Sequence, residues 1–371
     1  QKPKLTLKPA DIKNHLFVLI RSTLGNPSFS SQAKTECTKK IQLPKELSEQ
    51  ITPMVKTLLK SGLADELEAV AQFKNERSLK KTDGAKRSKI KVAKLDDANW
   101  AGTNNSASCT LIVTEGDSAK ALAIAGLSEV GRDKFGVFPL KGKPRNVRDV
   151  ATKTLMTNQE FADLKKILGL QQGKTYNSLS ELRYGRLMVM TDADVDGTHI
   201  KGLLLNMIHC FWPSLLNLGF VVSMITPVIK VTGIPGGSKS FFTDVAYKHW
   251  LETNGPLPRT AKVKYYKGLG TSTSTEAKEY FKAIDQLTVG FTDTPETDRS
   301  VVLAFDKTRA DARKKWLENH IKAPSPEVNY GEISNMPISD FINKDLVNFS
   351  VADVKRSIPH MVDGLKPSQR K

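Results

Sequence analysis

The spacing of apolar residues in the first part of the chain is helical. Apolar positions recur every three to four residues over 9–24 and Gly25 follows them, which predicts a helix that ends at this glycine. The same spacing predicts helical structure over 48–79, with an interruption at Gly62. We therefore expect a helical N-terminal region.

From residue 108 onward, short apolar runs alternate with helical segments. Runs rich in β-branched residues predict buried strands over 109–113, 187–190 and 221–231, and helices follow the first two. This alternation predicts an α/β fold with a mostly parallel sheet flanked by helices. In such sheets ligands bind at the carboxyl ends of the strands, where the first two runs are followed by acidic turns.

The second half of the chain has weaker patterns. Residues 262–266 alternate like a strand, and helices are predicted from about Ser274 and over 308–320. We expect residues 232–258 to be rich in turns and residues 290–299 to form a polar, acidic loop. Pro324 and Pro326 follow the last helix and mark a candidate domain boundary.

The two acidic turns hold the candidate chemistry. Glu115 follows the first predicted strand, and Asp192, Asp194 and Asp196 follow the second. Adjacent parallel strands would bring these four carboxylates together, where they repel one another. A divalent cation relieves that repulsion, and hard oxygen ligands suit Mg²⁺. The pattern predicts a magnesium site.

Other interpretations of the aspartate turn fit less well. An EF-hand loop would need Glu at its twelfth position, which is Leu203 here, so a calcium loop of that kind is excluded. An aspartyl phosphatase would explain neither Glu115 nor the excess of basic residues. A solvated acidic turn without chemistry would fit this motif alone, but the matching turn at Glu115 makes it a minor alternative.

Charge points to a polyanionic partner. Lys and Arg number 56 against 39 Asp and Glu, a formal net charge of +17, which favours nucleic acid. Basic residues gather over 74–94 and again over 132–148, which suits contacts with a phosphate backbone. The three cysteines fit neither a disulfide framework nor a zinc site. No apolar run approaches the about 20 residues of a membrane span, so we expect no membrane association.

Several stretches resemble a known family. Glu115 to Ala119 together with Asp192 to Gly197 resembles the Toprim signature, which primases and some nucleases share. Residues 139–143, 265–273 and 356–367 resemble eukaryotic-type (type IIA) DNA topoisomerase II more specifically. The resemblance extends over essentially the whole chain. It implies part of an ATP-dependent homodimer that cuts double-stranded DNA transiently and passes a second duplex through the break.

The resemblance also implies roles for individual residues. Glu115, Asp192 and Asp194 would be the catalytic carboxylates and bind Mg²⁺, for which Mn²⁺ or Ca²⁺ could substitute, and Asp196 would bind more weakly or support the site. Gln32 and Lys34 would reach the terminal phosphate of ATP, which would be bound by an ATPase domain upstream of Gln1. The DNA-binding residues would be Lys141, Lys143, Arg145, Lys267, Lys366, Arg370 and Lys371.

The implied domain order is a helical transducer end, a Toprim domain and the start of a winged-helix domain. We expect these at residues 1–80, 108–323 and 324–371, with a basic linker loop over 81–107. None of the seven tyrosines lies in the sequence context of the family's nucleophile. The chain alone is therefore expected not to cleave DNA by the family's mechanism.

Small departures from the family pattern predict a divergent member, from a large DNA virus or a protist. They include Ala33 in the ATP-contacting loop and Lys141 where the family often has Arg. A cellular enzyme would act in the nucleus, and a viral one in the host nucleus or cytoplasm. Two other functions remain open, a Toprim-type metal-dependent nuclease and a non-enzymatic DNA-binding module.

Overall fold

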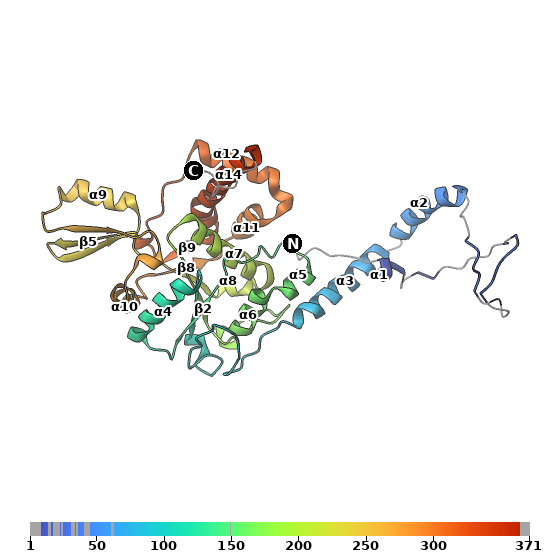
Figure 1. Ribbon diagram of the computed structural model, residues 1–371, viewed down its shortest axis with the longest axis horizontal. Helices are drawn as coiled ribbons and strands as arrows, with labels where there is room; N and C mark the ends of the chain where they lie inside the picture. The colour runs from blue at the N-terminus through green and yellow to red at the C-terminus, as the bar shows by residue number, and fades with distance from the viewer. Residues whose placement is uncertain are drawn as a thin grey trace. The chain divides into compact units, whose positions relative to one another are not determined.

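The structure is a computed structural model that describes residues 9–13, 16–17, 23, 25–30, 34, 36–40, 45–60, 63–148 and 150–363. It divides into two compact units, one comprising residues 5–77 and the other mainly residues 78–371 (Figure 1). In the described part of the chain, no helix is long and apolar enough to cross a bilayer.

The smaller unit is helical, as predicted. It contains α1 (Pro9–Lys13), α2 (Lys45–Lys60) and most of α3 (Leu63–Lys80). Residues 16–17 lie within the helix expected over 9–24, but they are not helical. Phe29 and Cys37 form an isolated antiparallel bridge.

A six-stranded sheet forms the centre of the larger unit. Its strands, in the order β2-β1-β3-β4-β8-β9, are β2 (Phe135–Pro139), β1 (Thr110–Thr114), β3 (Arg186–Met190), β4 (Val221–Met224), β8 (Thr288–Thr292) and β9 (Asn335–Pro337). All neighbouring pairs are parallel except β4 and β8. The prediction of a mostly parallel sheet is confirmed.

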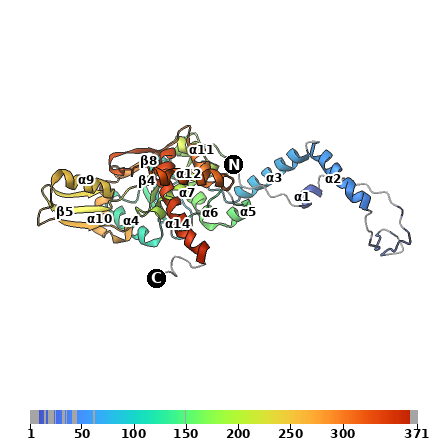
Figure 2. The same cartoon turned by 90° about the horizontal axis from the view of Figure 1, so that it is seen from above.

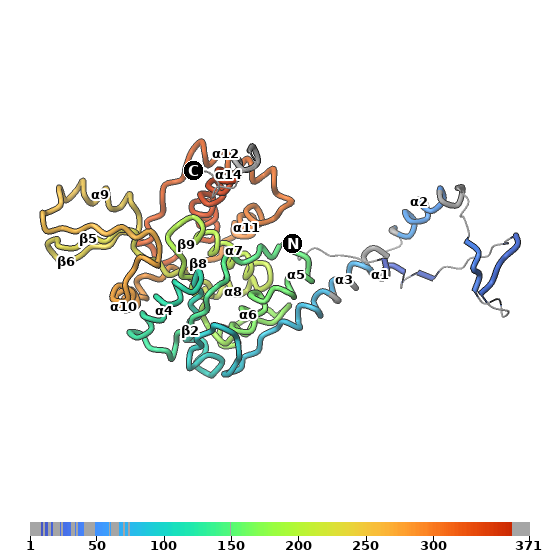
Figure 3. Tube along the Cα trace, viewed as in Figure 1, coloured from blue at the N-terminus to red at the C-terminus, as the bar shows by residue number. Residues whose placement is uncertain are grey.

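Helices cover both faces of this sheet, as the ribbon and the tube show (Figures 1 and 3). They are α4 (Asp117–Val130), α5 (Thr152–Thr157), α6 (Gln159–Leu168), α7 (Val195–Phe211), α8 (Ser214–Asn217), α10 (Ser274–Lys282), α11 (Thr297–Phe305), α12 (Ala310–Lys322), α13 (Ile338–Asp340) and α14 (Val347–Asp363). Short 3₁₀ helices are η1 (Ser106–Ser108), η2 (Leu179–Glu181), η3 (Leu269–Thr271), η4 (Lys307–Arg309) and η5 (Tyr330–Glu332), and η6 (Phe341–Leu346) is a π-helix.

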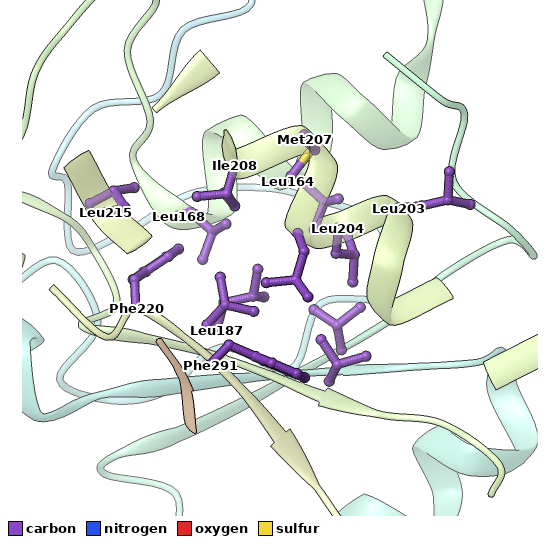
Figure 4. Close-up of a cluster of buried hydrophobic side chains, with 14 of the residues drawn as sticks. Leu164, Leu168, Leu187, Leu203, Leu204, Met207, Ile208, Leu215, Phe220 and Phe291 are labelled. Atoms are coloured by element: carbon purple, nitrogen blue, oxygen red, sulfur yellow. The ribbon is translucent and has the colours of Figure 1, made fainter. Parts of the chain in front are cut away.

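Alternate residues of each central strand enter different cores. Leu187 of β3 packs with α6 and α7, and Figure 4 shows Leu164, Leu204 and Ile208 around it. Met188 packs on the opposite face with residues of α4 and α10. Every residue of β1 is buried, because both faces of the sheet are covered. The uninterrupted apolar runs in the sequence reflect this double coverage.

A separate three-stranded sheet forms a small lobe, seen beside the main sheet in both ribbon views (Figures 1 and 2). Its strands β5 (Ile229–Ile234), β6 (Gly237–Phe241) and β7 (Lys262–Tyr265) run antiparallel in the order β6-β5-β7, and α9 (Asp244–Asn254) packs on one face. The lobe is basic. Lys230 forms a salt bridge with Glu279 of α10, and Lys264 forms one with Glu276 of the same helix.

Three predictions about secondary structure are wrong. The strand expected over 221–231 is two strands, β4 and β5, in different sheets, because Pro227 interrupts the run. The region 232–258 contains β6 and α9 in addition to turns. The loop expected over 290–299 contains most of β8 and the start of α11.

The basic segment 81–107 has little regular secondary structure, but it packs firmly on the larger unit. The buried ammonium of Lys165 donates hydrogen bonds to Leu79 O, Thr82 Oγ1 and Asp83 Oδ1 at 2.7–3.0 Å. Asp96 forms an antiparallel bridge with Val137 of β2. The basic linker loop expected over 81–107 is therefore tied to the rest of the larger unit by specific contacts.

Candidate functional site

The two acidic turns lie side by side at the carboxyl ends of adjacent parallel strands. β1 and β3 are paired in register, with Thr114 opposite Met190, so Glu115 and Asp192 leave the sheet at the same edge. Gly116 has φ 87°, a conformation that favours glycine, and it lets the chain turn at once into α4. The structure therefore brings together the acidic groups that the sequence singled out.

Glu115 carries an unsatisfied oxygen within this group. Its Oε2 atom is buried and has no hydrogen-bond partner among the described residues. Burial raises the pKa of Glu115, and the negative charges of Asp192, Asp194 and Asp196 raise it further. A cation at this position would be bound by this oxygen and would offset the repulsion among the carboxylates.

Asp192 is held by the turn that follows β7. Its Oδ1 atom accepts a hydrogen bond from the backbone N–H of Leu269 at 2.7 Å. The backbone of Gly268 lies against the same carboxylate. The sequence motif around residues 265–273 supported the family resemblance, but its contact with Asp192 was not predicted.

Asp194 begins α7. Its Oδ1 atom accepts the N–H of Gly197 at 2.7 Å, so the side chain caps the helix N-terminus. The carboxylate is otherwise exposed. One oxygen is thus fixed by the fold while the side chain remains open to solvent.

Asp196 is neutralised by two cations of the chain. Lys143 Nζ lies 2.8 Å from its Oδ1 atom, and the guanidinium of Arg356 contacts both carboxylate oxygens at 3.0 and 3.1 Å. These hydrogen bonds lower the pKa of Asp196 to about 2, and the bond from Arg356 has the larger effect. Arg356 belongs to a motif that carried the resemblance, but sequence reasoning gave it no role in the site.

The carboxylates are suited to a hard cation but do not form a closed cage. Among the residues that the structure describes, no three Asp, Glu, His or Cys side chains converge closely enough to enclose an ion. Glu115 has an unpartnered oxygen, and Asp192 and Asp194 each have one oxygen held by a backbone N–H, whereas both oxygens of Asp196 are paired with Lys143 and Arg356. The donor set fits Mg²⁺, which takes one or two carboxylates plus water or phosphate oxygens.

The residues predicted to bind DNA or ATP are only partly brought together. Lys141 and Arg145 are exposed on the loop that also carries Lys143, and Lys267 is exposed beside Gly268. Lys34 is exposed and has φ 55°. The predictions for Gln32, Lys366, Arg370 and Lys371 fall outside the described residues.

Comparison with known families agrees with this geometry. The model of the Toprim domain matches residues 110–225, and that of the C-terminal associated domain of TOPRIM matches residues 224–354. A probable DNA topoisomerase 2 from Dictyostelium discoideum is 48% identical over the whole chain, and DNA topoisomerase 2 from Arabidopsis thaliana is 46% identical over 98% of it. The chain belongs to the eukaryotic-type DNA topoisomerase II family.

The matched region is only part of those family members. The chain spans 24% of the length of the Dictyostelium relative and 25% of the Arabidopsis relative. A crystal structure of the Plasmodium falciparum topoisomerase II DNA-binding, cleavage and re-ligation domain superposes with a TM-score of 0.69 at 48% identity. That match covers 76% of this chain and 38% of the Plasmodium chain. The fold of that topoisomerase II domain therefore extends over about three-quarters of this chain.

Proposed function

We propose that this chain supplies the metal-binding carboxylates and part of the DNA-binding surface of an ATP-dependent type IIA topoisomerase. The unpartnered, buried Oε2 atom of Glu115 among three aspartates is the observation that carries the proposal. The whole enzyme would make a transient double-strand break and pass a second duplex through it. The relatives named as DNA topoisomerase 2 support this activity.

In this proposal Glu115, Asp192 and Asp194 hold Mg²⁺, and Asp196 supports the site through Lys143 and Arg356. A bound Mg²⁺ would offset negative charge that develops on the phosphate during strand cleavage. The chain's own residues orient Asp192 through the N–H of Leu269 and fix Asp194 at the start of α7. The attacking tyrosine would come from outside these 371 residues.

Double-stranded DNA is the proposed partner. The net charge of +17 supports this partner. Exposed Lys141 and Arg145 flank Lys143, which contacts Asp196, and exposed Lys267 precedes Gly268, which lies against Asp192. Lys366, Arg370 and Lys371 are also proposed to contact DNA. The Plasmodium relative is described as a DNA-binding, cleavage and re-ligation domain, which agrees with this proposal.

The remaining features of the family are proposed for the full-length protein. They are homodimerisation, ATP bound upstream with Gln32 and Lys34 at its terminal phosphate, and the division into residues 1–80, 81–107, 108–323 and 324–371. We propose the nucleus as the site of action of a cellular enzyme. One related topoisomerase 2 is named as mitochondrial, so targeting differs within the family.

Decatenation tests the proposal. A full-length protein containing this chain is compared with its Glu115→Gln variant in the presence of ATP and Mg²⁺, and Glu252→Gln, an exposed carboxylate on α9, is the matched control. We expect activity in the wild type and control and a loss of at least about 100-fold in Glu115→Gln, the scale of losing electrostatic stabilisation of a transition state. Equal activity in all three proteins would remove Glu115 from the site.

A second assay separates the alternatives. Mg²⁺-dependent cleavage of DNA by the 371-residue chain alone would favour a Toprim-type nuclease. DNA binding without decatenation, unchanged by Asp192→Ala, would favour a non-enzymatic binding module. The topoisomerase proposal expects neither result.

A further inference from the structure

The turn between β7 and α10 contacts a carboxylate that is distant in sequence. The N–H of Leu269 donates to Asp192 Oδ1 at 2.7 Å, across 77 positions of the chain. Leu269 is itself 2% exposed and packs in the core cluster on the α4 side of the sheet with Met190 of β3. The turn is therefore anchored to the same strand from which the Asp192 loop departs.

The backbone of Gly268 can lie against the Asp192 carboxylate because this residue has no side chain. A Cβ atom there would lie 2.7 Å from Asp192 Cγ and 3.0 Å from Oδ1, and closer still to Oδ2. The backbone of Gly268 is fully extended, with φ 178° and ψ 177°, so a residue with a side chain could adopt it. The need for glycine is therefore one of space around the carboxylate.

The nearby Gly270 provides an internal comparison. A Cβ atom added there would meet no atom within 4 Å. Two glycines of one short motif thus differ in the space around them, because Gly268 lies against the Asp192 carboxylate and Gly270 faces open space.

Glu276, at the start of α10, fixes the other end of the turn. Its carboxylate accepts hydrogen bonds from Lys264 Nζ at 2.8 and 2.9 Å, from the Tyr266 hydroxyl at 2.5 Å and from the Thr273 N–H at 2.7 Å. Burial opposes its ionisation, but these donors lower the pKa of Glu276 to about 2. Residues before and after Gly268 and Leu269 are thus tied to one charged centre.

We infer that the turn of residues 266–272 is a positioning device for Asp192, with Gly268 and Leu269 in contact with the carboxylate and Glu276 as the anchor. The inference rests on the proposed function, in which Asp192 is a metal ligand. The Leu269 N–H holds Oδ1, and the Gly268 backbone limits rotation of the carboxylate. Groups that orient metal ligands typically contribute about 10- to 100-fold to metal affinity.

Mn²⁺ binding to the nucleotide-free 371-residue chain tests the inference. Electron paramagnetic resonance of free Mn²⁺ gives the Kd for the wild type, Gly268→Ala, Gly270→Ala and Asp192→Ala. We expect about 10- to 100-fold weaker binding for Gly268→Ala. Gly270→Ala should stay within about twofold of the wild type because its added methyl group meets open space.

Loss of the metal site and loss of the positioning role give different results. If the wild type and Asp192→Ala bind Mn²⁺ with the same Kd, Asp192 is not a ligand and the proposed metal site is wrong. If Asp192→Ala loses affinity while Gly268→Ala keeps it, the metal site stands and the positioning role of the turn is overturned.

A second pair of variants tests the anchor without adding bulk beside Asp192. Glu276→Ala removes the acceptor that ties the turn, whereas Glu279→Ala removes the partner of Lys230 on the same helix. We expect a several-fold weaker Mn²⁺ Kd for Glu276→Ala, partial recovery in Glu276→Gln and no change for Glu279→Ala. Thermal unfolding followed by circular dichroism checks that each variant is folded, and equal Kd values for both alanine variants would refute the anchoring role.

Discussion

Arg356 and Asp196 lie 160 positions apart in the chain, and the guanidinium of one contacts both carboxylate oxygens of the other, at 3.0 and 3.1 Å. Lys143 adds a third hydrogen bond, at 2.8 Å, and its ammonium lies 4.9 Å from the centre of the Phe349 ring. The last aspartate of the Asp192–Asp196 motif is thus neutralised by the chain itself. This arrangement joins α14 to the acidic edge of the sheet.

Removing Arg356 should strengthen cation binding at this edge. In Arg356→Met a positive charge close to the carboxylates is lost, and the repulsion of an incoming cation falls. We expect Mn²⁺ to bind roughly five- to tenfold more tightly, a change of about 1 kcal/mol at an exposed site. Lys355→Met changes the charge equally at a neighbouring exposed position. Equal Kd values for the two variants would mean that Arg356 does not compete with the metal.

Glu115 should control the effect of metal on stability. In the wild type, Mn²⁺ relieves repulsion among the carboxylates, and a ligand at 100 times its Kd stabilises the folded state by about 2.7 kcal/mol. Differential scanning fluorimetry should therefore show a Tm that rises by several degrees with Mn²⁺. Glu115→Gln should lose most of that rise while its metal-free Tm is equal or higher. A full Mn²⁺-dependent rise in the variant would contradict the role of Glu115.

Asp345, which lines the same pocket as Asp194, should make the stability of the fold depend on pH. Burial, opposed by the charge of Lys201 and assisted by that of Glu327, raises its pKa from 3.8 to about 6. The Tyr330 hydroxyl donates a hydrogen bond to the carboxylate. The folded protein binds this proton more tightly than the unfolded chain. The resulting stabilisation is complete below pH 3.8 and is lost as the pH rises through about 6.

Urea unfolding at several pH values measures this effect. Between pH 4.5 and 7.5 the wild type should lose on the order of 2 kcal/mol relative to Asp345→Asn, which cannot titrate. Glu327→Gln should move the loss to lower pH, because a negative neighbour is removed. Parallel pH profiles for the wild type and Asp345→Asn would show that Asp345 does not titrate in this range.

The sequence predicted the elements whose residues are apolar throughout. Leu111 to Val113 of β1 and Leu187 to Met190 of β3 are uninterrupted apolar runs because both faces of the sheet are covered, and the position of the acidic turns followed from strand direction. β2 was not predicted because Gly136 and Pro139, two residues that are rare in strands, interrupt its apolar pattern. α9 was not predicted because only one of its residues, Tyr247, is buried, so the helix has no long apolar stripe.

The candidate site was predictable only where one local pattern sufficed. Glu115 and Asp192 end neighbouring strands, a relationship that the strand–helix alternation implies. Leu269 on Asp192 and Arg356 on Asp196 are contacts between segments distant in sequence, and they depend on where loops pack. No local spacing encodes such contacts, although both segments belong to motifs that resemble the family.

The segment 81–107 offers a final prediction, on stability. Arg183 is fully buried, and its guanidinium donates to Arg87 O at 2.6 Å, Ile167 O at 2.8 Å and Asp97 Oδ2 at 2.6 Å. Arg183→Met keeps the bulk of the side chain but leaves Asp97 and the two carbonyls without this donor. Removing one partner of a buried ion pair typically costs about 3–5 kcal/mol. Urea unfolding should show a loss of that size, with earlier tryptic cleavage within residues 81–107.

Arg186→Met, at the exposed first residue of β3, is the matched control and should change the free energy of unfolding by less than about 0.5 kcal/mol. Asp97→Asn should cost less than Arg183→Met, because the amide can still accept a hydrogen bond from Arg183 and leaves no unpaired negative charge. If Arg183→Met and Arg186→Met have the same stability, the ion pair does not hold this segment, and the packing of residues 81–107 must depend on Lys165 and Asp83 instead.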